Sequence, residues 1–96
     1  MSVRERIINR LTQVFSPIYL EVVDFSEQHH GHAGYRDGGG SHIEVVIVTD
    51  LFVGKTLPDR HRLVYEALNE EIENGLHALK IKTLTLEQAH KRNLKI

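Results

Sequence analysis

Residues 42–50, His-Ile-Glu-Val-Val-Ile-Val-Thr-Asp, are the stretch that decides the fold. From Ile43 to Val48 the run is apolar and mostly β-branched, with Glu44 as its one charged residue. This composition is typical of a strand, because branched side chains pack well on a pleated surface. The run is too apolar for the fully exposed edge of a sheet, so we expect a strand over residues 42–50 that is covered by other elements.

The residues before this strand predict a helix and a partner strand. Ser2 and Glu5 have the spacing of a capping box, and apolar residues recur at helical intervals as far as Phe15. Ser16-Pro17 ends that helix. Residues 18–25 are rich in β-branched and aromatic residues and predict a strand. The two strands would form a hairpin with an oversized loop over residues 26–41, which is rich in histidine and glycine.

The residues after the strand predict a helix, a third strand and a terminal helix. Thr56-Leu57-Pro58-Asp59 has the cap, proline and acid of a helix start, and Asn74-Gly75 is a helix stop. Residues 76–83 predict a strand, and because a helix joins it to the strand before, the two should be parallel. Thr85 and Gln88 again have capping-box spacing, and the tail at residues 91–96 is expected to fray.

The predicted fold is therefore α+β in the order αββαβα, with a mixed three-stranded sheet and helices packed on one face. A length of 96 residues fits one domain over residues 1–96. The formal net charge of −1 gives no global reason to expect a nucleic-acid partner. No apolar run is long enough to span a membrane, and the first residues lack the apolar pattern of a signal peptide, so we expect a cytoplasmic protein.

Seven histidines and no cysteines shape the candidate chemistry. Neutral imidazole binds zinc, copper, nickel and iron, so a metal site without thiolates is possible. Four histidines lie in or beside the long loop: His29, His30, His32 and His42. A fifth, His77, opens the predicted third strand. From composition alone, ordinary solvated loop histidines are the favoured interpretation, and a chelating site needs a ligand on rigid structure such as His77.

A second group is basic and lies near the start of the predicted helix after Thr56. It consists of Lys55, Arg60, His61 and Arg62. Basic side chains near a helix N-terminus are able to grip phosphate, so these are the candidate nucleic-acid contacts. The alternative is an ordinary solvated helix start, because Arg and Lys are usually exposed. No P-loop, G-x-G-x-x-G, G-x-S-x-G or H-E-x-x-H motif is present, and we expect no enzyme activity.

Several segments in a fixed order resemble the BolA family. They are Ser41 to Val48, Phe52-Val53-Gly54-Lys55, Arg60-His61-Arg62-Leu63-Val64-Tyr65 and His77-Ala78-Leu79-Lys80-Ile81-Lys82-Thr83, with Arg4 to Ile7 and Leu20 to Asp24 before them. The resemblance covers about residues 2 to 90. It implies a fold similar to class II KH domains, but without the nucleotide-clamping G-x-x-G loop of true KH domains.

The resemblance further implies a partner and a cofactor. BolA-like proteins bind monothiol glutaredoxins, and the pair holds a bridging 2Fe-2S cluster with thiolates from the glutaredoxin and glutathione. The family histidine at the third strand matches His77, and a second ligand from the loop best matches His29, with His32, His30 and His42 as alternatives. No cofactor is expected in the isolated chain, which would be a monomer or weak homodimer.

Three hypotheses follow. The first is a non-enzymatic adaptor that shares the cluster with a monothiol glutaredoxin in iron–sulfur cluster handling or iron sensing. The second is a DNA-binding transcriptional regulator of stress and morphology, as some bacterial BolA-like proteins are, with the basic group on phosphates. The third is a simple metal buffer that uses the loop histidines alone.

Overall fold

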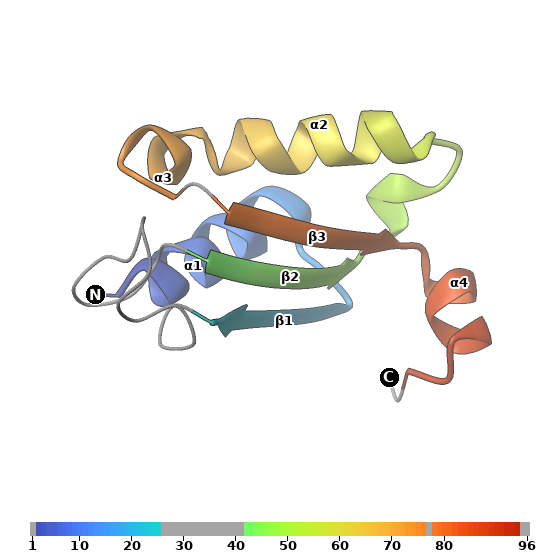
Figure 1. Cartoon of the computed structure of the whole chain (residues 1–96). Helices are drawn as coiled ribbons and strands as arrows, with labels where there is room; N and C mark the ends of the chain where they lie inside the picture. The colour runs from blue at the N-terminus through green and yellow to red at the C-terminus, as the bar shows by residue number, and fades with distance from the viewer. Residues whose placement is uncertain (1, 26–41, 77, 95–96) are drawn as a thin grey trace.

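The computed structural model describes residues 2–25, 42–76 and 78–94. The predicted order of helices and strands is confirmed (Figure 1). The elements are α1 (Val3–Phe15), β1 (Tyr19–Asp24), β2 (His42–Val48), the 3-10 turn η2 (Asp50–Phe52), α2 (Leu57–Ala67), α3 (Asn69–Glu73), β3 (Ala78–Leu84) and α4 (Leu86–Lys91). The predicted loop at 26–41 lies outside the described residues.

The sheet has the order β1-β2-β3, so the apolar strand β2 lies in the middle. β1 pairs with β2 antiparallel, from Tyr19 opposite Val48 to Asp24 opposite Ile43. β2 pairs with β3 parallel, from His42 opposite Ala78 to Val48 opposite Leu84. This mixed three-stranded sheet confirms the prediction, and the central place of β2 explains why its sequence is so apolar.

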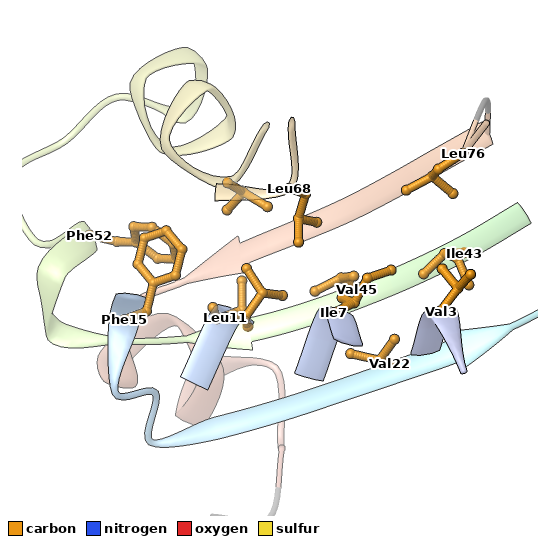
Figure 2. Packing of buried hydrophobic residues seen from close by; sticks show 12 residues of the cluster. Val3, Ile7, Leu11, Phe15, Val22, Ile43, Val45, Phe52, Leu68 and Leu76 are labelled. Atoms are coloured by element: carbon orange, nitrogen blue, oxygen red, sulfur yellow. The ribbon is translucent and has the colours of Figure 1, made fainter. Parts of the chain in front are cut away.

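The main core lies between one face of the sheet and the helices α1 and α2. Figure 2 shows side chains from α1 and from the sheet pointing toward one another. Helical spacing puts one residue of each α1 turn in this core, and alternation does the same for β2. The buried residues are Val3, Ile7, Leu11, Phe15, Val22, Ile43, Val45, Ile47, Phe52, Val64, Leu68 and Leu76. The rings of Phe15 and Phe52 pack 5.6 Å apart and fill one end of it.

A smaller cluster lies on the other face, at the end where β2 and β3 finish. Val48, Leu84 and Ala89 are buried there, with Tyr19 and Val46 packed against them. Because Val48 and Leu84 alternate with the core-facing residues of their strands, α4 packs on the face opposite α1 and α2. The prediction that the helices pack on one face of the sheet is therefore confirmed for α1 and α2, while α4 covers part of the other face.

The predicted helix boundaries rest on caps that the structure contains. Both capping boxes form, Ser2 with Glu5 at α1 and Thr85 with Gln88 at α4, and Thr56 caps α2. The helix predicted from Thr56 to Asn74 is interrupted at Leu68, where α2 ends and the short α3 follows. None of the helices in the described ranges is both long and apolar enough to cross a membrane.

Candidate functional site

The sheet has two ends with different surroundings. At the first, which we call the His42 end, β1 finishes at Asp24 while β2 and β3 begin at His42 and Ala78. The backbone N–H of Phe25 donates to the His42 carbonyl at 2.8 Å, which extends the β1–β2 ladder by one bond. Chain segment 26–41 and position 77 are both joined to this end.

Most of the predicted metal ligands lie outside the described residues. This applies to His77, His29, His30 and His32. His42 is the exception: it begins β2, its side chain is half-buried, and its ring lies edge-on to Phe25 with centroids 6.0 Å apart. Within residues 2–25, 42–76 and 78–94, no group of three or more His, Cys, Asp or Glu side chains is placed to hold a metal.

The second end, which we call the Arg60 end, is where β2 and β3 finish and α4 packs (Figure 1). Arg60 is 6% exposed. Its Nε donates to the Lys55 carbonyl at 3.0 Å, and its Nη1 donates to the Thr83 carbonyl at 3.2 Å and to Gln88 Oε1 at 2.8 Å. The guanidinium also lies 5.8 Å from the centre of the Phe52 ring.

Arg60 therefore differs from the surface position predicted for it as one of four basic nucleic-acid contacts. It joins the start of α2 to the end of β3 and to α4, and most of its donors are used inside the fold. The sequence held a signal for this placement. Arg60, Val64 and Leu68 are four residues apart and share the buried side of the helix.

The other three basic residues of that group are more accessible. Lys55 and Arg62 are exposed and His61 is half-buried. Arg62 forms an ion pair with Asp59, at 2.7 Å between Nη2 and Oδ1. Lys55, Arg60 and His61 line one hollow, while Arg62 is not among its lining residues.

Two further basic residues that the sequence did not single out lie near Lys55 and His61. Lys82 on β3 and Arg92 after α4 line the same hollow as Lys55, Arg60 and His61. Lys82 shows one signal in the sequence, because it alternates with the core-facing residues of β3 and points away from the core. Arg92 shows none, because only the packing of α4 brings it there.

Comparison with known proteins places the chain in a family. A family model described as BolA-like protein matches residues 11–88. The DNA-binding transcriptional regulator BolA of Escherichia coli (strain K12) is 42% identical over 88 residues, which cover 92% of this chain and 80% of that protein. Protein BOLA1, chloroplastic, of Arabidopsis thaliana is 44% identical; the match covers 83% of this chain and 51% of that protein.

A solved structure gives the same result. The BolA domain of SufE1 from Arabidopsis thaliana matches with a TM-score of 0.80 and 42% identity, over 91% of this chain and 95% of that one. The mixed sheet and the helices described above are therefore the architecture of BolA domains. Several relatives are named as BolA proteins or as DNA-binding transcriptional regulators.

Proposed function

The chain belongs to the BolA-like family, and from that premise we propose that it is a non-enzymatic adaptor for iron–sulfur clusters. It binds a monothiol glutaredoxin, and the two proteins share a bridging 2Fe-2S cluster. His77 is the ligand on the sheet side and His29 the ligand from the loop, with His32, His30 and His42 as alternatives. The glutaredoxin and glutathione supply the thiolates.

The observation that carries this proposal is the register at the His42 end. Position 77 directly precedes Ala78, and Ala78 is the register partner of His42. Position 29 is four residues beyond Phe25, which is hydrogen-bonded to His42. A chain of four residues spans at most about 14 Å. The segments that carry the proposed ligands are thus tethered to one end of one sheet, which supports their use on a common iron.

The donor set of this chain fits a shared cluster better than one held by the chain alone. The sequence has no cysteine, so all thiolates must come from elsewhere. Histidine replaces cysteine on one iron of Rieske-type 2Fe-2S centres and raises their reduction potential. A cluster with mixed histidine and thiolate ligands supplies one-electron chemistry and exchangeable iron. The role of this chain is to bind the partner and present imidazole nitrogen.

Reconstitution tests the proposal. The chain is mixed with a monothiol glutaredoxin, glutathione, ferrous iron and sulfide, and the visible circular dichroism is compared with that of the glutaredoxin alone. We expect a new spectrum for the pair, changed by His77→Ala and unchanged by His90→Ala, which alters an exposed histidine on α4 at the Arg60 end. The absence of a mixed-ligand spectrum, or an unchanged spectrum with His77→Ala, would refute the proposal.

Replacing the loop histidines identifies the second ligand and tests the metal-buffer hypothesis. Single replacements of His29, His30 and His32 should show one position with a large spectral effect, and we expect it to be His29. A metal buffer that uses the loop alone gives a different pattern. Its zinc or copper binding would survive His77→Ala and disappear when the three loop histidines are replaced together.

A DNA-binding regulator is the second candidate, and one relative favours it. The Escherichia coli protein, 42% identical to this chain, is named a DNA-binding transcriptional regulator. In this chain Lys55 and His61 are the accessible basic residues of the predicted group, while Arg60 is buried and Arg62 is paired. Binding through phosphates requires affinity that falls as salt rises. No DNA binding at low salt, or binding that is independent of salt, would exclude this role.

A further inference from the structure

A basic hollow of about 540 Å³ lies at the Arg60 end, between the start of α2, the end of β3 and the residues after α4. Five of its lining residues are basic: Lys55, Arg60, His61, Lys82 and Arg92. The rest are apolar or uncharged polar, and none is Asp or Glu. Basic side chains from three elements thus meet around one concave surface.

The arginine in this hollow has donors to spare. A guanidinium carries five N–H groups. The Nε–H and the two N–H groups of Nη1 are used by Lys55, Thr83 and Gln88. Nη2 has no acceptor among the described residues. Among the described residues, Thr83 Oγ1 is the one side-chain polar atom that is both fully buried and without a partner. Nη2 of Arg60 also lacks a partner among them, so it is not fully buried and is part of the surface that Arg60 contributes to the hollow.

The basic residues of the hollow also lack counter-charges. Within the described ranges no carboxylate lies within ion-pair distance of Lys55, Arg60, Lys82 or Arg92. Their neighbours behave differently. Lys80 pairs with Glu44 at 3.5 Å, Lys91 with Glu87 at 3.2 Å and Arg62 with Asp59 at 2.7 Å. In the described part of the chain, four cations without an ion pair therefore line the hollow, while their sequence neighbours Arg62, Lys80 and Lys91 are paired. The other described cations without an ion pair, Arg4 and Arg10, lie elsewhere and donate to backbone carbonyls.

This arrangement favours an anion. A buried cation with no counter-ion is costly, and several cations around a concave surface raise the local positive potential. An anion that accepts from Nη2 of Arg60 and approaches Lys82 and Arg92 would satisfy both the donors and the charge. Phosphate suits such a set, because its oxygens accept several charge-assisted hydrogen bonds at once.

We infer that this hollow binds the phosphate group of a small phosphorylated molecule. A volume of about 540 Å³ is large enough to admit a small phosphorylated molecule. The recessed place of Arg60, 6% exposed, requires a group that enters the hollow, which a terminal phosphate does more readily than the backbone of a duplex. The residues of the hollow are separate from the proposed cluster ligands, so this inference and the adaptor proposal fail independently.

Adenosine monophosphate and adenosine are matched probes, because they differ only in the phosphate. Titration of the ¹⁵N-labelled chain followed by NMR should show saturable shifts around Arg60, Lys82 and Arg92 with the nucleotide, and none with the nucleoside. The nucleotide affinity should fall as salt is added. No saturable shift up to about 10 mM nucleotide, or equal shifts with adenosine, would overturn the inference.

Two pairs of variants localise the site. Lys82→Gln and Arg92→Gln should each weaken nucleotide binding about fivefold, since each removes one charged donor. Lys80→Gln and Lys91→Gln, which remove paired cations outside the hollow, should change it less than about twofold. Equal effects in both pairs would mean general charge attraction and overturn the inference. Displacement of the nucleotide by an equimolar short DNA duplex would do the same and reassign the hollow to nucleic acid.

Discussion

The two ends of the sheet differ in what holds them together. At the Arg60 end one buried side chain joins α2, β3 and α4 through hydrogen bonds to two backbone carbonyls and to Gln88. At the His42 end the contacts include the strand ladder, the packing of Phe25 on His42, the Lys80–Glu44 ion pair and the apolar packing of Val3, Ile43 and Leu76, and no single buried polar side chain is described that joins several elements. The fold therefore fixes the geometry of the Arg60 end. The proposed chemistry of the His42 end depends on segments joined to the sheet and on thiolates from a partner.

Of the variants that test this difference, Arg60→Met should have the largest effect on the free energy of unfolding. Arg60→Met keeps the aliphatic length but removes the donor to the Lys55 and Thr83 carbonyls and to Gln88 Oε1, of which, among the described residues, only Gln88 Oε1 keeps another donor, the backbone N–H of Thr85. We expect a loss of about 3 kcal/mol in the free energy of unfolding, measured by urea denaturation. Arg62→Met, two residues away and exposed with a surface ion pair, should cost less than about 0.5 kcal/mol. Equal losses would show that Arg60 does not organise this end.

Thr83 offers a smaller effect of opposite sign. It is 2% exposed, and its Oγ1 is fully buried without a hydrogen-bond partner among the described residues. Valine has nearly the same shape and favours strands, so Thr83→Val removes a desolvated hydroxyl at little packing cost. We expect stability to rise by about 1 kcal/mol. A loss of stability with this variant would mean that the hydroxyl has a partner.

The smallest expected effect concerns the pKa of the Tyr19 hydroxyl. Burial raises the pKa of its hydroxyl, and the hydrogen bond to Glu21 at 3.2 Å and the charge of that carboxylate raise the pKa further. Because the pKa is raised in the folded state, the contribution of the protonated Tyr19 to the free energy of unfolding is present at neutral pH and is lost as pH rises through the folded pKa. Glu21→Gln should therefore lower the pKa of Tyr19, with the contribution of burial remaining, in a titration followed by tyrosinate absorbance. An unchanged pKa would exclude Glu21 as a cause.

Much of the fold could be predicted because its signals are local. The apolar run of β2, the caps at Ser2, Thr56 and Thr85, and the helical connection between β2 and β3 each depend on residues close together in sequence. The second face covered by α4 could not be predicted in the same way. It depends on how a short helix of six residues packs after β3, which sequence periodicity does not determine.

The candidate sites were predictable to different extents. The sequence predicts one basic group that includes Arg60, His61 and Arg62, whereas in the helix Arg60 is buried and Arg62 is exposed. Lys55, Lys82 and Arg92 are far apart in sequence and meet only through tertiary packing. The proposed cluster ligands are a third case, because the sequence of one protein does not contain the thiolates that another protein would supply. Only the resemblance to the BolA family indicates such a shared site.

The most direct test of the adaptor proposal is to detect imidazole nitrogen on the cluster. The chain is labelled with ¹⁵N-histidine, reconstituted with unlabelled glutaredoxin, glutathione, iron and sulfide, and reduced for pulsed EPR. We predict a ¹⁵N hyperfine coupling of directly bound nitrogen, lost or altered with His77→Ala and retained with His90→Ala. A reduced cluster without ¹⁵N coupling, or with the same coupling after His77→Ala, would contradict the account.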